Sequence, residues 1–172
     1  QGAFDNVKSD KVLACLRRRG FAPWFIKWYG FFLQNRAVTA QLGNITVVFY
    51  IEDGTPQGGV LSPVIWNITF DDFIQLLDNM QGTEIIVFAD DGFTVINGST
   101  SAELKERAER FLHVASLWTK NSGLKINASK TDIMHVPMLL NDPPVLELGG
   151  VILKYCSQVK FLGIIFDPTL DF

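Results

Sequence analysis

Residues 84–96 constrain the fold of this chain most, because two adjacent aspartates, Asp90 and Asp91, interrupt two runs of strand-forming residues. Apolar, β-branched and aromatic residues on both sides of a short polar step predict a β-hairpin, with its turn at Asp90-Asp91-Gly92. Neighbouring carboxylates repel each other, and beside apolar strands they need a cation or a metal ion to stay ionised. No lysine or arginine is close in sequence to supply that charge.

This turn has two interpretations. Asp91-Gly92 is a common hairpin signal, since glycine accepts a positive φ, and turn chemistry alone would explain it. Alternatively, the turn presents Asp90 and Asp91 to divalent metal ions. Two such ions, about 3.5–4 Å apart, clamp the attacking and leaving oxygens of a phosphoryl transfer. The rest of the chain has to decide between the two.

Charge is distributed unevenly along the 172 residues, although the net charge is only −3. Residues 1–36 carry seven basic and two acidic side chains, whereas residues 37–96 carry eight acids and no lysine or arginine. An acidic block that closes on Asp90-Asp91 favours a metal-binding centre, and the low net charge argues against a simple nucleic-acid-binding module. We expect Asp71, Asp72 and Asp78 to be solvated. For the basic run 17–19 we expect a solvated helix end, with phosphate contact as the alternative.

Composition bounds the class of protein. The 48% hydrophobic content suits one globular domain, and the two cysteines form neither a disulfide framework nor a zinc pattern, which fits a reducing compartment. No long apolar run or signal peptide is present, so we expect a soluble intracellular protein, in cytoplasm and nucleus, without a membrane partner. Because the chain opens without methionine, we expect it to be a fragment of a longer protein.

Periodicity and turn residues predict the elements in order. We expect helices at 10–19, 24–33, from Ser62 to about residue 80, and from a capping box at 100–103 to about residue 118. We expect hairpins about 43–44 and 149–150 and a final strand at 159–166. The aromatic residues of 24–33 should pack in the core, with one ring at most left for base stacking. Four-apart charge pairs are expected at Glu103–Arg107 and Glu106–Arg110.

A glycine-rich loop, Gly54-Thr-Pro-Gln-Gly-Gly59, joins a predicted strand to the helix that begins at Ser62-Pro63. It lacks the lysine of an NTP-hydrolysing P-loop. Its glycines allow close backbone approach, and Gln57 can both donate and accept hydrogen bonds. Alone, this could be an ordinary tight turn. Followed by a helix and a hairpin with two aspartates, it points to a larger pattern.

That pattern resembles a reverse transcriptase of the non-LTR retrotransposon type. The resemblance rests on four stretches in order across nearly the whole chain: Gly54 to Asn67, Phe88-Ala89-Asp90-Asp91, Gly123 to Thr131, and Phe161-Leu162-Gly163. Group II intron reverse transcriptases are similar in pattern, but Val-Ile-Trp-Asn after Ser62-Pro63 favours the retrotransposon type. Two departures stand out: Gly92 follows the aspartates in place of an aliphatic residue, and Phe88 replaces a tyrosine.

The resemblance implies an α+β fold, the palm of a right-hand polymerase, with an antiparallel sheet and helices packed on one face. Residues 1–172 would form a partial reverse transcriptase domain that runs into the palm–thumb junction at about 145–172, without the start of the fingers and without the thumb. The implied activity is RNA-directed DNA polymerase, a nucleotidyltransferase. The implied partners are an RNA template, a DNA primer, dNTPs and the rest of the parent polyprotein, namely fingers, thumb and an optional endonuclease.

The resemblance also implies roles for particular residues. Asp90 and Asp91 would be catalytic and bind two Mg²⁺ ions, with Mn²⁺ as an alternative. Gln57 and Gly58 would position template and dNTP, and Phe4 would exclude a ribose 2′-hydroxyl. Lys130 would donate a proton to the pyrophosphate leaving group, unless it is a solvated strand end.

One catalytic aspartate of the family is expected just before Gln1, so Asp5 is expected to be structural and the fragment alone inactive. Three alternatives stay open: a group II intron-type enzyme, an RNA-dependent RNA polymerase palm, and a non-catalytic palm remnant that serves nucleic-acid binding or assembly.

Overall fold

The computed structural model describes residues 3–34, 36–136 and 143–170. The chain divides into two compact units, Gln1–Phe73 with Lys120–Leu124, and Ile74–Thr119 with Lys125–Phe172. Helices and antiparallel strands confirm the predicted α+β class. In the described residues the strands form four two-stranded sheets, each a single hairpin, where one larger sheet was expected.

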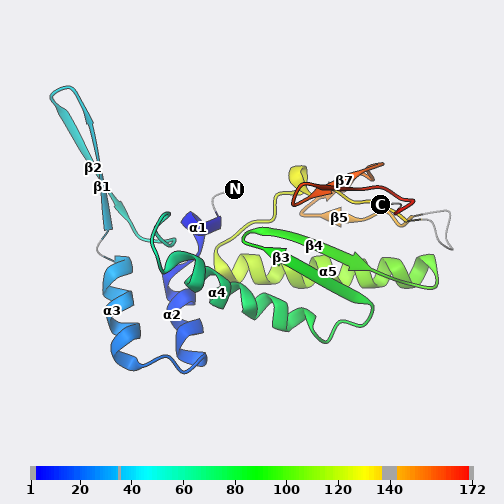
Figure 1. Cartoon of the computed structure of the whole chain (residues 1–172), viewed down its shortest axis with the longest axis horizontal. Coiled ribbons are helices and arrows are strands. Elements are labelled where there is room, and N and C mark those ends of the chain that lie inside the picture. Colours follow the sequence, from blue (N-terminus) through cyan, green and yellow to red (C-terminus); the bar gives the residue numbers. More distant parts are fainter. Residues whose placement is uncertain (1–2, 35, 137–142, 171–172) are drawn as a thin grey trace. The chain divides into compact units, whose positions relative to one another are not determined.

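The first unit contains the helices α1 (Ala3–Asn6), α2 (Ser9–Arg18), α3 (Pro23–Gln34) and the start of α4 (Ser62–Leu77). Helices α2 and α3 lie side by side (Figure 1). Apolar side chains at helical spacing form the core between them: Val12, Cys15 and Leu16 from α2, and Ile26, Tyr29 and Leu33 from α3.

The expectation that the aromatic residues of α3 pack in the core is wrong for most of them. Trp24 is 71% exposed, Phe31 69%, Trp28 48% and Phe32 41%, whereas Tyr29 is fully buried. The reason is geometric: a helix buries one stripe against its neighbour, and aromatic residues here occur on every face. The exposed rings contact one another instead, as in the stacked pair Trp28–Phe32 with centroids 6.0 Å apart.

Strands β1 (Arg36–Leu42) and β2 (Ile45–Ile51) form the predicted hairpin about Gly43-Asn44. The register pairs Arg36 with Ile51 and Leu42 with Ile45. Every residue from 37 to 50 is exposed, although none is charged. In Figure 1 this hairpin projects from the end of α3 as a long two-stranded arm.

Two arginines at the end of α2 and two aspartates of α4, all expected to be solvated, form ion pairs with one another. Arg18 forms an ion pair with Asp72, and Arg19 forms one with Asp71, both aspartates lying on α4. This corrects the expectation for Asp71 and Asp72. Ion pairs between distant helices depend on tertiary contact, which the sequence pattern did not reveal.

The second unit contains the end of α4 and most of α5 (Ser101–Ser122), whose last three residues belong to the first unit. Its other elements are β3 (Thr83–Phe88), β4 (Asp91–Ile96), the 3₁₀ helix η1 (Ala128–Lys130), β5 (Glu147–Leu148), β6 (Val151–Ile152), β7 (Val159–Phe161) and β8 (Ile164–Phe166). Its core joins Ala108 of α5 to Leu146, Leu148 and Leu153, and Ile96 of β4 packs against this cluster. None of the helices in the described ranges combines the length and apolar content that crossing a bilayer requires.

Residues 159–166 form a hairpin and not the single strand that was expected. Leu162 and Gly163 adopt positive φ values of 49° and 87° between β7 and β8, the backbone that a tight two-residue turn requires. The expected hairpin at Gly149-Gly150 is confirmed, with both glycines at positive φ. The turn at 162–163 was missed because leucine rarely adopts this conformation.

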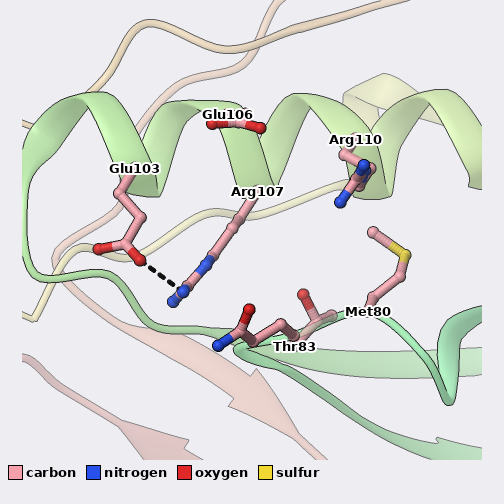
Figure 2. Close-up of a pocket in the computed structure, with 7 residues that line it drawn as sticks. Met80, Thr83, Glu103, Glu106, Arg107 and Arg110 are labelled. Carbon is pink, nitrogen blue, oxygen red and sulfur yellow. Dashed lines mark hydrogen bonds and ion pairs between the residues drawn. The ribbon is translucent and has the colours of Figure 1, made fainter.

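The capping box of α5 is present in a variant form. The Thr100 hydroxyl accepts the Glu103 amide, and the Glu103 carboxylate accepts the amide of Ser99. The same carboxylate pairs with Arg107 at 2.5 Å, as predicted (Figure 2). Among the described residues the second helical pair is Lys105–Glu109, at 3.7 Å, and not Glu106–Arg110.

Tyr29 provides a test of this packing. Its hydroxyl is buried and has no hydrogen-bond partner among the described residues, and burial raises the pKa of the phenol, opposed by the nearby charge of Arg36. Because an unpaired buried hydroxyl is costly, Tyr29→Phe should raise the free energy of unfolding by about 1 kcal/mol.

The matched control is Tyr155→Phe. The Tyr155 hydroxyl donates to the Pro144 carbonyl at 2.8 Å, so its removal should lower the free energy of unfolding by about 1 kcal/mol. Urea unfolding of both variants measures the two effects. A change in the free energy of unfolding of the same sign in both variants would contradict the prediction.

Candidate active site

In the first unit, residues 4–9 pack against the loop that follows β2. The Gly54 amide donates to the Val7 carbonyl at 2.8 Å, and the Thr55 amide donates to the Phe4 carbonyl at 2.6 Å. At the other end, the Asp53 carboxylate accepts the Ser9 amide at the start of α2, where a negative charge suits the helix dipole. The two segments are therefore held together along their length.

Close approach of the two backbones depends on Gly54. Its φ is +82°, and a Cβ there would lie 2.5 Å from the Asp5 carbonyl oxygen. Both the conformation and the space exclude a larger residue. The first glycine of the glycine-rich loop is thus a packing requirement of the site.

Phe4 is half-buried and lies against Trp66 of α4, with ring centroids 4.9 Å apart. Its carbonyl is fixed by Thr55, whose side chain is 1% exposed. A backbone hydrogen bond to Thr55 and the ring contact with Trp66 therefore both fix the position of Phe4.

Gln57 lies beside the same segment. Its amide Nε2 donates to the Asp5 carboxylate at 2.7 Å, and both side chains are exposed. This contact brings Phe4, Asp5 and Gln57 into one site, and it agrees with a structural role for Asp5. Gly58 follows at φ +78° with nothing within 4 Å of an added Cβ, so its conformation, and not crowding, requires glycine.

The end of the loop is fixed by Ser62. The helix was expected to begin with Ser62 as its cap, but α4 starts at Ser62 itself, and the hydroxyl donates to the Pro56 carbonyl at 2.5 Å. Gly59 leaves room for this contact, since an added Cβ would lie 2.8 Å from the Ser62 oxygen. Loop and helix are therefore joined by a side chain, which the capping pattern did not predict.

In the second unit, the carboxylates lie at the tip of the β3–β4 hairpin, but the turn is displaced from its predicted position. Phe88 pairs with Asp91 and Val87 with Gly92, which leaves Ala89 and Asp90 as the turn residues. Ala89, and not Gly92, takes the positive φ, at 54°. The Asp91-Gly92 signal was misleading because continuing the strand pairing places Gly92 inside β4.

The positive φ at Ala89 is strained for an L-residue, at a cost of about 1–2 kcal/mol. Such strain is found at functional sites whose surroundings enforce it. Here it directs Asp90 and Asp91 to the end of the hairpin.

Asp90 and Asp91 are both exposed, and among the described residues neither carboxylate has an ion pair or hydrogen bond. Carboxylate oxygens are the ligands that Mg²⁺ prefers, and Mg²⁺ is commonly bound by one or two carboxylates together with water and substrate phosphates. The donor set therefore fits a divalent ion. No group of three or more histidine, cysteine, aspartate or glutamate side chains gathers within the described ranges.

Lys130 ends the 3₁₀ helix η1, and its side chain is exposed. Asn127 orders this turn by accepting the amide and hydroxyl of Ser129. In the described part of the chain Lys130 forms no ion pair, with Asp90 and Asp91 or with any other acid.

A polar hollow of about 190 Å³ lies between α5 and the start of β3 (Figure 2). Its lining comprises Met80, Gln81, Thr83, Glu103, Glu106, Arg107 and Arg110. Thr83 is the first residue of β3, whereas the carboxylates follow the last. The hollow therefore lies at the end of the β3–β4 hairpin opposite to the carboxylates.

Sequence reasoning gave no role to Arg36, which the structure places beside the glycine-rich loop. Its guanidinium donates to the carbonyls of Leu33, Asp53 and Gly54, at 3.0, 2.7 and 2.8 Å. Its place as the last cation before the acidic block was the available signal.

Comparison with known proteins decides the family. The model of the family described as reverse transcriptase (RNA-dependent DNA polymerase) matches residues 1–166. The chain belongs to the reverse transcriptase family.

The relatives of this reverse transcriptase chain confirm the retrotransposon resemblance. It is 30% identical over its full length to the putative 115 kDa protein in type-1 retrotransposable element R1DM of Drosophila melanogaster, covering 16% of that protein. It is 30% identical to the Pol polyprotein of retrotransposable element R1 of Bradysia coprophila, covering 17%. It is 27% identical to the RNA-directed DNA polymerase from mobile element jockey of Drosophila funebris, covering 19%. The chain thus spans less than a fifth of each of these relatives.

The packing at Gly54 can be tested by adding one methyl group. Gly54→Ala should lower the free energy of unfolding by more than about 2 kcal/mol, because it combines a positive φ with a backbone clash. Gly58→Ala is the matched control, since it has a similar φ but open space around it. Chemical denaturation of both variants isolates the clash, and equal losses would refute it.

Strain at the carboxylate turn can be tested with Ala89→Gly. Glycine adopts a positive φ without strain, so the variant should gain about 0.5–1 kcal/mol of stability despite the greater freedom of its unfolded chain. Ala40→Gly, at an exposed position within β1, should instead lose about 0.5–1 kcal/mol. Thermal and urea unfolding measure both changes, and a loss at both positions would argue against strain at Ala89.

Proposed function

We propose that this chain is part of the palm of an RNA-directed DNA polymerase that extends a primer 3′-hydroxyl on an RNA template. The observation that carries the proposal is that two adjacent carboxylates, without an ion pair or hydrogen bond among the described residues, lie at the tip of the β3–β4 hairpin in a chain of the reverse transcriptase family. Residues 1–172 would form a partial domain that reaches the palm–thumb junction at about 145–172. Template, primer, dNTPs and the rest of the parent polyprotein are the partners, in cytoplasm and nucleus.

The chemistry needs charge neutralisation and positioning more than covalent catalysis. We assign to Asp90 and Asp91 the binding of divalent ions, Mg²⁺ in the first place. Those ions would supply stabilisation of the charge that develops on the attacking and leaving oxygens. Carboxylates that no cation of the described chain neutralises are suited to this task.

The remaining roles follow from where the side chains lie. Phe4, wedged on Trp66, would occupy the space that a ribose 2′-hydroxyl needs and so favour dNTPs. Gln57 and Gly58 would position template and nucleotide, with the Gln57 amide oriented by Asp5. Lys130, exposed and without an ion pair among the described residues, would donate a proton to the leaving pyrophosphate.

Asp90→Asn in the full-length parent protein is the decisive experiment. The amide keeps the size of the side chain and removes its charge, so primer extension on an RNA template with Mg²⁺ should fall at least about 100-fold. Asp78→Asn, at another exposed acid of the same block, should leave extension unchanged.

Two outcomes would count against the proposal. Undiminished extension by Asp90→Asn would remove these carboxylates from the chemistry. A wild-type parent protein that extends no primer but binds nucleic acid would favour the non-catalytic alternative.

A further inference from the structure

Arg36 lies where α3 ends and β1 begins, and its guanidinium connects two parts of the first unit. The Nε atom donates to the Leu33 carbonyl in the last turn of α3. The Nη2 atom donates to the carbonyls of Asp53 and Gly54, in the loop beyond β2. One side chain thus ties a helix end to a loop seventeen and eighteen residues away in sequence.

Arginine suits this position for physical reasons. Carbonyls at a helix C-terminus lack helical partners and carry the negative end of the dipole, which favours a cation. The planar guanidinium presents several donors in a fixed fork, whereas lysine presents one compact ammonium. Burial lowers the pKa of the Arg36 guanidinium, opposed by Tyr29 and Asp53. The contacts with Leu33 and Gly54 are partly buried, and contacts partly shielded from water are stronger than exposed ones.

The two loop carbonyls belong to peptide groups that are also held from the other side. In the peptide between Asp53 and Gly54, the carbonyl accepts from Arg36 and the amide donates to Val7. In the peptide between Gly54 and Thr55, the carbonyl again accepts from Arg36 and the amide donates to Phe4. Arg36 therefore fixes the orientation of both peptide planes, and with them the register of residues 4–7.

We propose that Arg36 is a positioning residue that places Phe4 and Gln57 for the incoming nucleotide. Arg36 has no hydrogen bond with the Gln57 side chain among the described residues, and it acts through the loop that carries Gln57 and holds the backbone of Phe4. The inference rests on the proposed function, because Phe4 and Gln57 have substrate roles only there. A residue that merely stabilised the helix end would not affect nucleotide selection.

The test uses Arg36→Lys in the full-length parent protein, which keeps the charge and loses the fork. The KM for dNTP should rise about tenfold, and kcat should change less than about threefold, because the defect lies in nucleotide placement. Discrimination against rNTPs should fall, since the Gly54–Thr55 peptide that holds the Phe4 carbonyl is less firmly oriented. Arg18→Lys is the matched control: Arg18 pairs with Asp72 in the same unit and does not contact the loop, so all three values should stay at wild-type levels.

A second measurement does not depend on activity. Amide hydrogen exchange of the substrate-free parent protein should be faster at Gly54 and Thr55 in Arg36→Lys and unchanged in α5. Arg36→Gln, which retains two donors, should show the same local change.

The outcomes separate this inference from the proposed function. A parent protein inactive as wild type would refute the proposed function whatever the exchange shows. In an active parent protein, wild-type KM and rNTP discrimination in Arg36→Lys would overturn the positioning role, even if exchange increased. Failure of both Arg36 variants to fold would assign the residue to stability alone and overturn the inference as well.

Discussion

Two successive peptide groups, on either side of Gly54, hold the first unit's site together. Their carbonyls accept from Arg36, and their amides donate to Val7 and Phe4. Buried backbone groups must be paired, and here the pairing itself joins three distant segments. It requires a residue without a Cβ at Gly54. The contacts of Phe4 with Trp66 and of Gln57 with Asp5 depend on this arrangement.

A second constraint is electrostatic. The eight acids of residues 37–96 have no cation in their own block, and the fold gives them different partners. Asp71 and Asp72 pair with arginines of α2, and Asp53 accepts the first amide of that helix. Asp90 and Asp91 remain without a partner among the described residues. Glu52, Asp78 and Glu84 are exposed as well, but only Asp90 and Asp91 are adjacent and lie at the end of a strained turn.

Much of the secondary structure could be predicted from local pattern. The hairpins about 43–44 and 149–150, the capping contact of Thr100 and the pair Glu103–Arg107 all depend on residues close in sequence. The errors came where a residue takes a conformation unusual for its type. Ala89 and Leu162 adopt positive φ, and propensity predicts neither. The exposure of Trp24 was also missed, because aromatic content shows hydrophobicity but not which face of a helix finds a neighbour.

The sequence by itself determined the candidate carboxylates, the glycine–glutamine loop and the family, because each depends on residue types at fixed spacing along the chain. Only the tertiary structure decided that Phe4, Asp5 and Gln57 meet, that Gly54 permits it, and that Arg36 secures the loop. The physical reason is that these contacts are hydrogen bonds and close packing between segments eighteen to about fifty residues apart. Such contacts leave no periodicity in the chain and are specified only when the core brings the segments together.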